Sequence, residues 1–278
     1  MELGLKGKKA IVCASSRGLG RGCALALAKE GVSLVINGVD QERILRTADE
    51  IAKRTSVEVK PIAADLDDPE GRAALLDACP EPDILINNNG GPPPGNFRDW
   101  GKEEWDAGLT ANFLAPSELI RATVDGMIER GFGRIVNVTS IAVRTPFPGL
   151  AMSSASRSAL TALVASVSRE VAAHNVTINN LQPGIFETDR MLIGLKGAAR
   201  RQVVLSRTHE RACSPTFLLV VLGIPKSLVM PAHFYAAVIA VSLRVKIFCL
   251  MGAISGGLFK CYCVVAGIKY VSVDNLMV

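Results

Sequence analysis

The chain has 278 residues, of which 49% are hydrophobic and 21% are charged. This length predicts one or two domains, and the composition excludes a disordered or low-complexity protein while leaving enough apolar material for one large core. Seven Cys are too few for a disulfide scaffold and show no metal-ligand spacing, so we expect no metal site.

The formal net charge of +5 is unevenly distributed along the chain. Residues 1–194 carry 21 Lys and Arg against 24 Asp and Glu, a net charge of −3. Residues 195–278 carry 10 basic residues against only Glu210 and Asp274, a net charge of +8. Two compositions therefore join near residue 195. Because every motif described below lies in the mildly acidic part, we expect no nucleic-acid partner.

The ends and the apolar runs bear on location. Met1–Lys9 is short and polar, with no apolar stretch behind it, so we expect no secretory signal and a cytoplasmic protein. The longest run without a charged residue near the C-terminus is Ser227–Leu243, 17 residues, which is shorter than the roughly 20 that a spanning helix needs. This favours buried helices and strands, with membrane association as the alternative.

Short apolar runs alternate with amphipathic segments along the first 194 residues. In the first helical segment, Leu19, Cys23, Ala26 and Leu27 fall on one helix face. The predicted strands are Ala10–Cys13, Val32–Ile36, Val57–Ile62, Asp83–Asn87, Gly133–Thr139 and Val176–Leu181. The predicted helices begin near Leu19 and then cover Gln41–Lys53, Glu70–Ala78, Lys102–Arg130 and Ser153–Ala173.

Strands separated by helices imply crossover connections and a parallel sheet with helices on both faces. We therefore predict an α/β fold: a Rossmann-like, doubly wound parallel sheet in three layers, α/β/α. Ligands of such sheets bind at the carboxyl ends of the strands, where all the motifs below lie.

The segment Cys13–Gly20 joins the first strand to the first helix and contains Gly18 and Gly20. These glycines let backbone amides approach a pyrophosphate, and the helix that follows offers unpaired N–H groups and a positive dipole end. A glycine pair alone fits an ordinary turn equally well. Its place between a buried strand and an amphipathic helix favours a dinucleotide-binding loop.

The type of dinucleotide is read at the end of the second strand. That strand ends in Ile36-Asn37-Gly38-Val39 without an acid to hold a ribose hydroxyl, and Asp40 comes later. Arg17 lies inside the loop, where a guanidinium can pair with a phosphate. We therefore expect the cofactor to be NADP, with NAD as the alternative. If Arg17 pairs with no phosphate, we expect it to be a solvated charge in the loop.

These motifs, in this order, resemble those of the short-chain dehydrogenase/reductase family, over about residues 5–192. The matching segments are Ala14–Gly20, Asp65-Leu66 after the third strand, Asn87-Asn88-Asn89-Gly90 where the family has Asn-Asn-Ala-Gly, Asn112, Ser140 at the end of Val136–Ser140, and Pro183–Thr188. The resemblance is strongest to the 3-oxoacyl-carrier-protein reductase branch. It implies an NAD(P)-dependent oxidoreductase that acts on a small carbonyl or alcohol substrate as a homodimer or homotetramer.

The resemblance also implies site residues. Asn112, Ser140, Ser153 and Arg157 take the catalytic positions. The cofactor positions are Ala14, Ser16, Arg17, Gly18, Leu19, Gly20, Asn37, Asp65, Leu66, Asn88, Asn89, Gly90, Arg157, Pro183, Gly184, Ile185 and Thr188.

The chain departs from the family at its catalytic pair. The family's Tyr-x-x-x-Lys is replaced by Ser153-Ser-Ala-Ser-Arg157, and all three Tyr lie beyond residue 230. A phenol has a pKa near ~10 and becomes a useful acid after a modest shift, whereas an aliphatic alcohol is a far weaker acid. Ser153 and Arg157 still share one helix face, at i and i+4, and can hold and polarise a carbonyl while water supplies the proton.

Three functions remain open at this stage. The first is an oxidoreductase with an altered proton-donor site, in which Arg157 can recognise an acidic substrate. The second is a catalytically impaired dinucleotide-binding protein with a regulatory or interaction role. The third is a membrane-associated or damaged product.

Residues 195–278 diverge from the family pattern. We expect residues 1–194 to form the dinucleotide-binding core and residues 195–278 to supply the substrate-closing region and the last strand of the same domain. Tyr270–Val278 resembles that last strand, and the preceding stretch contains Cys261 and Cys263, which we expect to be buried thiols.

Overall fold

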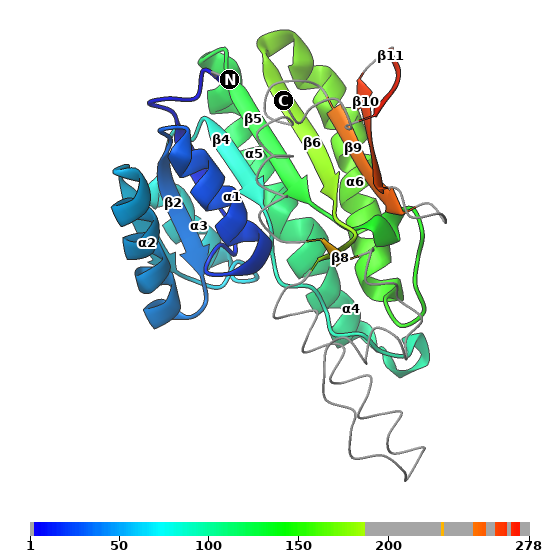
Figure 1. Ribbon diagram of the computed structural model, residues 1–278. Coiled ribbons are helices and arrows are strands. Elements are labelled where there is room, and N and C mark those ends of the chain that lie inside the picture. Colours follow the sequence, from blue (N-terminus) through cyan, green and yellow to red (C-terminus); the bar gives the residue numbers. More distant parts are fainter. Residues whose placement is uncertain (1–2, 187–228, 231–246, 254–258, 266–267, 273–278) are drawn as a thin grey trace.

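The computed structural model describes residues 3–186, 229–230, 247–253, 259–265 and 268–272, the last four segments and residues 185–186 through their backbone only. Its centre is a nine-stranded sheet with the order β11-β10-β9-β6-β5-β4-β1-β2-β3 (Figure 1). The first six strands, all parallel to their neighbours, are β1 (Lys9–Val12), β2 (Ser33–Gly38), β3 (Val59–Ala63), β4 (Ile84–Asn87), β5 (Gly133–Val138) and β6 (Val176–Gln182). The doubly wound parallel sheet is confirmed, and strand order reverses between β1 and β4.

Helices cover both faces of this sheet, as expected for three layers (Figure 1). Val12 of β1 packs in one core with α1 (Gly18–Lys29) and α2 (Gln41–Thr55). Its neighbour Ile11 packs in the other core with α3 (Pro69–Ala78), α5 (Ala115–Glu129) and α6 (Ala151–Val171). Successive residues of a strand point to opposite faces, so a continuous apolar strand serves both cores. Short 3₁₀ turns are η1 (Phe97–Asp99), η3 (Ile141–Val143) and η4 (Ala172–His174).

One expected helix is interrupted. Residues 102–130 form α4 (Lys102–Leu109), a π-helical turn η2 (Thr110–Leu114) and α5 rather than one regular helix. The N–H of Ala115 donates to the carbonyl of Thr110, five residues back. Pro116 follows in the first turn of α5, where its missing N–H is tolerated. The π turn accommodates one extra residue per turn, and such turns are frequent at functional sites.

The strand next to β6 comes from the C-terminal part of the chain. β9 (Ile247–Ala253) pairs parallel with β6, whereas Tyr270 lies in β11 (Ile268–Ser272) at the outer edge, antiparallel to β10 (Phe259–Val265). The segment Tyr270–Val278, expected to resemble the last strand of the domain, contributes Tyr270 to Ser272 to β11, the last described strand of this sheet in chain order, and residues 273–278 lie outside the described residues. The connections 254–258 and 266–267 are too short for parallel crossovers, so β10 and β11 fold back antiparallel. A separate two-stranded sheet pairs β7 (Ile185–Phe186) with β8 (Val229–Met230).

Three asparagines form a hydrogen-bonded ladder inside the sheet. Asn87 on β4, Asn137 on β5 and Asn180 on β6 are direct neighbours in the strand register, and all three are buried. Asn87 Nδ2 donates to Asn137 Oδ1 at 2.9 Å, and Asn137 Nδ2 donates to Asn180 Oδ1 at 3.1 Å. Asn87 Nδ2 also donates to the carbonyl of Pro116 at 3.3 Å. The ladder therefore ties the carboxyl ends of three strands to the start of α5.

Removing the middle rung should destabilise the fold. Asn137→Ala takes a donor from buried Asn180 Oδ1 and an acceptor from Asn87, so we expect the free energy of unfolding to fall by about 2 kcal/mol. Urea unfolding followed by circular dichroism measures the change. A loss below about 0.5 kcal/mol, the range of ordinary surface substitutions, would show that the ladder does not stabilise the sheet.

Candidate active site

The loop between β1 and α1 is held from two neighbouring strand ends. Ala14 adopts a left-handed conformation with φ +42°, and Gly18 one with φ +58°. The N–H of Ala14 donates to Asn37 Oδ1 at 3.2 Å, and its carbonyl accepts from Asn88 Nδ2 at 3.2 Å. A Cβ on Gly20 would lie 2.3 Å from the Ala14 carbonyl oxygen, so only glycine fits at this first turn of α1.

The N-terminus of α1 suits an anion. Its N-cap is Arg17, with an extended backbone and no side-chain hydrogen bond to the helix, and the first turn holds no acid. The side chain of Arg17 is exposed beside this turn. A helix start without a capping side chain fits the pyrophosphate of a dinucleotide, and the nearby guanidinium can pair with a further phosphate.

The side chain of Asn37 is engaged within the protein. It is 2% exposed, and besides holding Ala14 it donates from Nδ2 to the carbonyl of Ala64 at 2.9 Å. Ser15, which the sequence analysis did not single out, donates from Oγ to the Val12 carbonyl at 2.7 Å and accepts from the Asn37 N–H at 3.1 Å. Ser15 and Asn37 thus lock the carboxyl ends of β1, β2 and β3 together and shape the loop.

The first acid after β2 is also engaged. Asp40 caps α2 by accepting from the Arg43 N–H at 2.9 Å, and its other oxygen pairs with the Arg43 guanidinium at 3.0 Å. Ser16 lies beside this strand end: its carbonyl accepts from Thr47 Oγ1 at 3.0 Å, and its side chain lies against Gly38. The one acid between residues 36 and 40, Asp40, therefore already serves the cap of α2 and Arg43.

The loop after β3 combines an exposed acid with a buried wall. Asp65 is exposed and Leu66 is 3% exposed. The buried Arg72 of α3 donates from Nη1 to the Leu66 carbonyl at 2.7 Å and pairs through Nη2 with Glu118 of α5 at 2.6 Å. A lone Arg within a short amphipathic helix gave no signal in the sequence, and only its burial shows that it fixes this loop.

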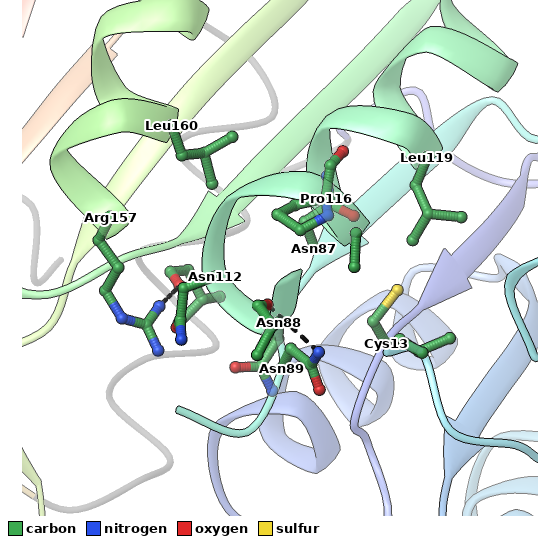
Figure 2. Close-up of a pocket in the computed structure, with 13 residues that line it drawn as sticks. Cys13, Asn87, Asn88, Asn89, Asn112, Pro116, Leu119, Arg157 and Leu160 are labelled. Carbon is green, nitrogen blue, oxygen red and sulfur yellow. Dashed lines mark hydrogen bonds between the residues drawn. The ribbon is translucent and has the colours of Figure 1, made fainter. Parts of the chain in front are cut away.

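A pocket opens at the carboxyl ends of β1, β4 and β5 (Figure 2). Sequence-predicted residues from four separate segments meet in its wall, namely Leu66, Asn88, Asn89, Asn112 and Arg157. Cys13 also lines it, but burial raises the pKa of its thiol to about 12, so it stays protonated and is a poor nucleophile.

The predicted pair on α6 is in contact. Arg157 donates from Nε to Ser153 Oγ at 3.2 Å and from Nη1 to the Val138 carbonyl at 2.7 Å. The i, i+4 spacing therefore places both side chains on one face, and the second bond anchors the guanidinium to the end of β5.

Asn112 lies in the π turn η2 and is 3% exposed. Its Nδ2 donates weakly to the Gly108 carbonyl at 3.4 Å, and its Oδ1 has no hydrogen-bond partner within the described part of the chain. Asn87 Oδ1 is in the same state, and both residues line the pocket. Two buried acceptors beside one pocket favour a ligand or water that donates hydrogen bonds.

Further predicted residues lie on the segments that follow β4, β5 and β6. Ser140 follows β5 and caps η3, accepting from the Ala142 N–H at 3.1 Å. The carbonyl of Pro183 accepts from the Ile141 N–H at 2.9 Å, so the turn at Pro183 and Gly184 lies next to that of Ser140. Gly90 follows Asn89 at the surface. Ile185 is described only as backbone in β7, and Thr188 lies outside the described residues.

Comparisons with known proteins agree with this arrangement. The family model described as short chain dehydrogenase matches residues 8–192. An uncharacterized oxidoreductase, YvaG of Bacillus subtilis, is 34% identical over 190 residues, covering 68% of this chain and 72% of YvaG. The 3-oxoacyl-[acyl-carrier-protein] reductase FabG of Aquifex aeolicus is 30% identical over 217 residues, covering 74% of this chain and 86% of FabG. The solved structure of YwfH, an NADPH-dependent reductase involved in bacilysin biosynthesis, superposes with a TM-score of 0.73 at 28% identity, covering 85% of this chain and 91% of YwfH.

The left-handed Ala14 makes the loop a site of strain. An L-residue in this conformation costs roughly 1–2 kcal/mol that glycine does not, part of which the greater freedom of unfolded glycine cancels. We expect Ala14→Gly to raise the free energy of unfolding by about 0.5–1 kcal/mol in urea titrations. Ser56→Gly is the matched control, because Ser56 ends α2 with φ +58° outside the site. A gain for Ser56→Gly without one for Ala14→Gly would contradict strain at Ala14.

Proposed function

Because the chain belongs to the short-chain dehydrogenase family, we propose that it is an NAD(P)-dependent oxidoreductase that transfers a hydride between NADP(H) and a carbonyl or alcohol carbon, with an altered proton-donor site. The observation that carries this proposal is the pocket itself. It brings Asn112 and Arg157 together with Asn88 and Leu66, next to the uncapped start of α1.

The residues that would hold the dinucleotide follow from its charge and shape. The N–H groups of Gly18, Leu19 and Gly20 would bind the pyrophosphate, and the Arg17 guanidinium would bind the 2′-phosphate of NADP. Leu66 would form the apolar wall against the adenine, with Asp65 beside it, and Pro183, Gly184, Ile185 and Thr188 would meet the nicotinamide end. When bound, the nicotinamide supplies or accepts the hydride.

Two observations support NADP over NAD. Asp40 already caps α2 and pairs with Arg43, which makes it a less suitable partner for a ribose 2′-hydroxyl, whereas the exposed guanidinium of Arg17 suits a 2′-phosphate. The similarity to YwfH, an NADPH-dependent reductase that is 28% identical to this chain, supports the same choice.

The catalytic proposal rests on polarisation rather than on a strong general acid. Ser153 Oγ accepts from the Arg157 guanidinium, which leaves its own O–H to donate to a substrate oxygen. Ser140 would supply a second hydroxyl donor. Asn112, which lies in the π turn, would position the two hydroxyl groups. Because an alcohol is a poor acid, protonation would fall to water, at a loss of part of the ~10²–10⁴-fold that general acid catalysis contributes.

For the substrate we propose a 3-oxoacyl thioester. The support is the resemblance of the motifs to the 3-oxoacyl-carrier-protein reductase branch and the 30% identity to FabG. The expectation that Arg157 recognises an acidic substrate stays a prediction.

A second candidate is a dinucleotide-binding protein without redox turnover. The observation that favours it is the pair itself: an aliphatic hydroxyl is a far weaker acid than a phenol and a guanidinium keeps its protons, so this pair holds no efficient proton donor. The two candidates share cofactor binding and differ only in turnover.

Cofactor binding is the first test. In titrations of nicotinamide fluorescence we expect NADPH to bind more tightly than NADH. Arg17→Ala should weaken NADPH binding about tenfold through the lost charge-assisted bond and leave NADH nearly unchanged. Arg169→Ala, which removes an exposed charge from the last turn of α6, is the control for net charge. Absence of binding by either nucleotide would overturn both candidates.

Turnover separates the two candidates. We expect slow NADPH oxidation with 3-oxoacyl thioesters that Ser140→Ala reduces by tenfold or more, while Ser166→Ala, at an exposed position of α6, has no effect. Ser153→Tyr combined with Arg157→Lys should raise the rate by restoring a phenol with a neighbouring cation. Activity confined to that double variant would instead establish the wild-type chain as a binder without turnover.

Other expectations from the sequence concern location, assembly and domain limits. Within the described residues, no helix is long and apolar enough to cross a membrane. The cytoplasmic location, the homodimer or homotetramer, and the division at residue 194 stay predictions. Residues 195–228, which follow that division, and the side chains of Cys261 and Cys263 lie outside what the structure describes.

A further inference from the structure

The side chain of Asn89 joins the cofactor loop after β3 to the turn that carries Asn112. Its Nδ2 donates to Asp67 Oδ1 at 2.8 Å and to the carbonyl of Ala111 at 3.2 Å. Its Oδ1 accepts from the N–H of Gly90 at 2.7 Å. Figure 2 shows Asn89 among the pocket residues, beside Asn88 and Asn112.

The partners fix the orientation of this amide. A carboxylate and a carbonyl can only accept, so both must face the NH₂ group, and the Gly90 N–H can only donate, so it must face the oxygen. A flipped amide would lose all three bonds. Asn89 is therefore locked in one orientation, with both of its protons in use.

The bond to Ala111 meets a need created by the π turn. In the π register the carbonyl of Ala111 would pair with the N–H five residues on, but that residue is Pro116, which has no N–H. The N–H of the intervening Ala115 already donates to Thr110. Asn89 supplies a donor at the carbonyl next to Asn112, in place of the one that Pro116 lacks.

The bond to Asp67 connects Asn89 to the loop after β3. Asp67 follows Leu66, whose carbonyl is fixed by Arg72. The pairs Arg72–Leu66 and Asn89–Asp67 therefore hold this loop from α3 and from the end of β4. The side chain of Asn89 is therefore hydrogen-bonded both to the segment proposed to contact adenine and to the turn that carries Asn112.

We propose that Asn89 is a positioning residue that couples the adenine-side loop to the turn of Asn112, so that each is ordered in the geometry the dinucleotide requires. The functional part of this inference rests on the proposed dinucleotide binding. Asn89 stands where the family's motif has Ala, so the coupling belongs to this chain rather than to the motif.

Binding of NADPH to Asn89→Ala tests the proposal. We expect the Kd for NADPH to rise about threefold to tenfold, the magnitude of a net hydrogen bond. Asn96→Ala is the matched control, because Asn96 also holds one turn by accepting from the Arg98 N–H, at η1. A residue that only stabilises the fold would lower Tm without changing a Kd measured well below it.

A double-mutant cycle identifies the partner. If Asn89 acts through Asp67, then Asp67→Ala and the double variant should weaken NADPH binding about as much as Asn89→Ala alone. Additive effects, or a Kd for Asn89→Ala equal to that of Asn96→Ala, would overturn the proposal.

Amide hydrogen exchange of the chain without nucleotide separates this inference from the function proposed above. We expect Asn89→Ala to speed exchange both at residues 65–68 and at residues 110–116, and Asn96→Ala to change neither. Unchanged exchange at either segment would refute the coupling. Faster exchange at both segments in a chain that failed to bind NADPH would support the coupling while overturning the proposed function.

Discussion

Side-chain amides at the carboxyl ends of the central strands are the interaction on which this site depends. A parallel sheet leaves several strand ends side by side, with backbone groups that the sheet itself does not pair. Asn37 ties β1 to β2 and β3, Asn88 holds the loop after β1, and the ladder from Asn87 through Asn137 joins β4 to β5. Each amide carries both donors and an acceptor, so a single buried side chain can satisfy two strands at once.

The same interactions decide which groups remain available for chemistry. Asn37 braces the fold and Asp40 caps α2, so the loop between β1 and α1 offers backbone N–H groups and Arg17 to a ligand. Arg157, by contrast, is anchored at the end of β5 and still lines the pocket. The site therefore has a guanidinium on two sides, which suits a phosphate-bearing cofactor and a carbonyl that gains negative charge.

Much of the fold was predictable from local pattern. The six parallel strands and the helices α1, α2, α3 and α6 follow from the period of apolar residues, and their observed ends lie within two residues of those expected. Two features were not predictable. The helix expected over residues 102–130 contains a π turn. The helical periodicity of the sequence does not show this change of register, which only the hydrogen bond to the Thr110 carbonyl reveals. The order of the outer strands in the sheet could not be predicted, because a short apolar run does not indicate which strand it pairs with. In the structure β9 lies beside β6, and the segment at Tyr270 lies at the outer edge.

For the site, the sequence alone determined which residue types stand at the ends of which strands, and hence the family. Gly18 and Gly20 mark the proposed phosphate loop, and Ser153 and Arg157 mark the altered pair. The reason is that glycine spacing and the i, i+4 rule are local properties of the chain. Only the tertiary structure decided that Asn37 braces strands, that Ala14 is strained, that buried Arg72 holds Leu66, and that Asn89 joins two loops. These roles depend on contacts between separate loops, strands and helices or on one backbone angle, and no local pattern encodes either.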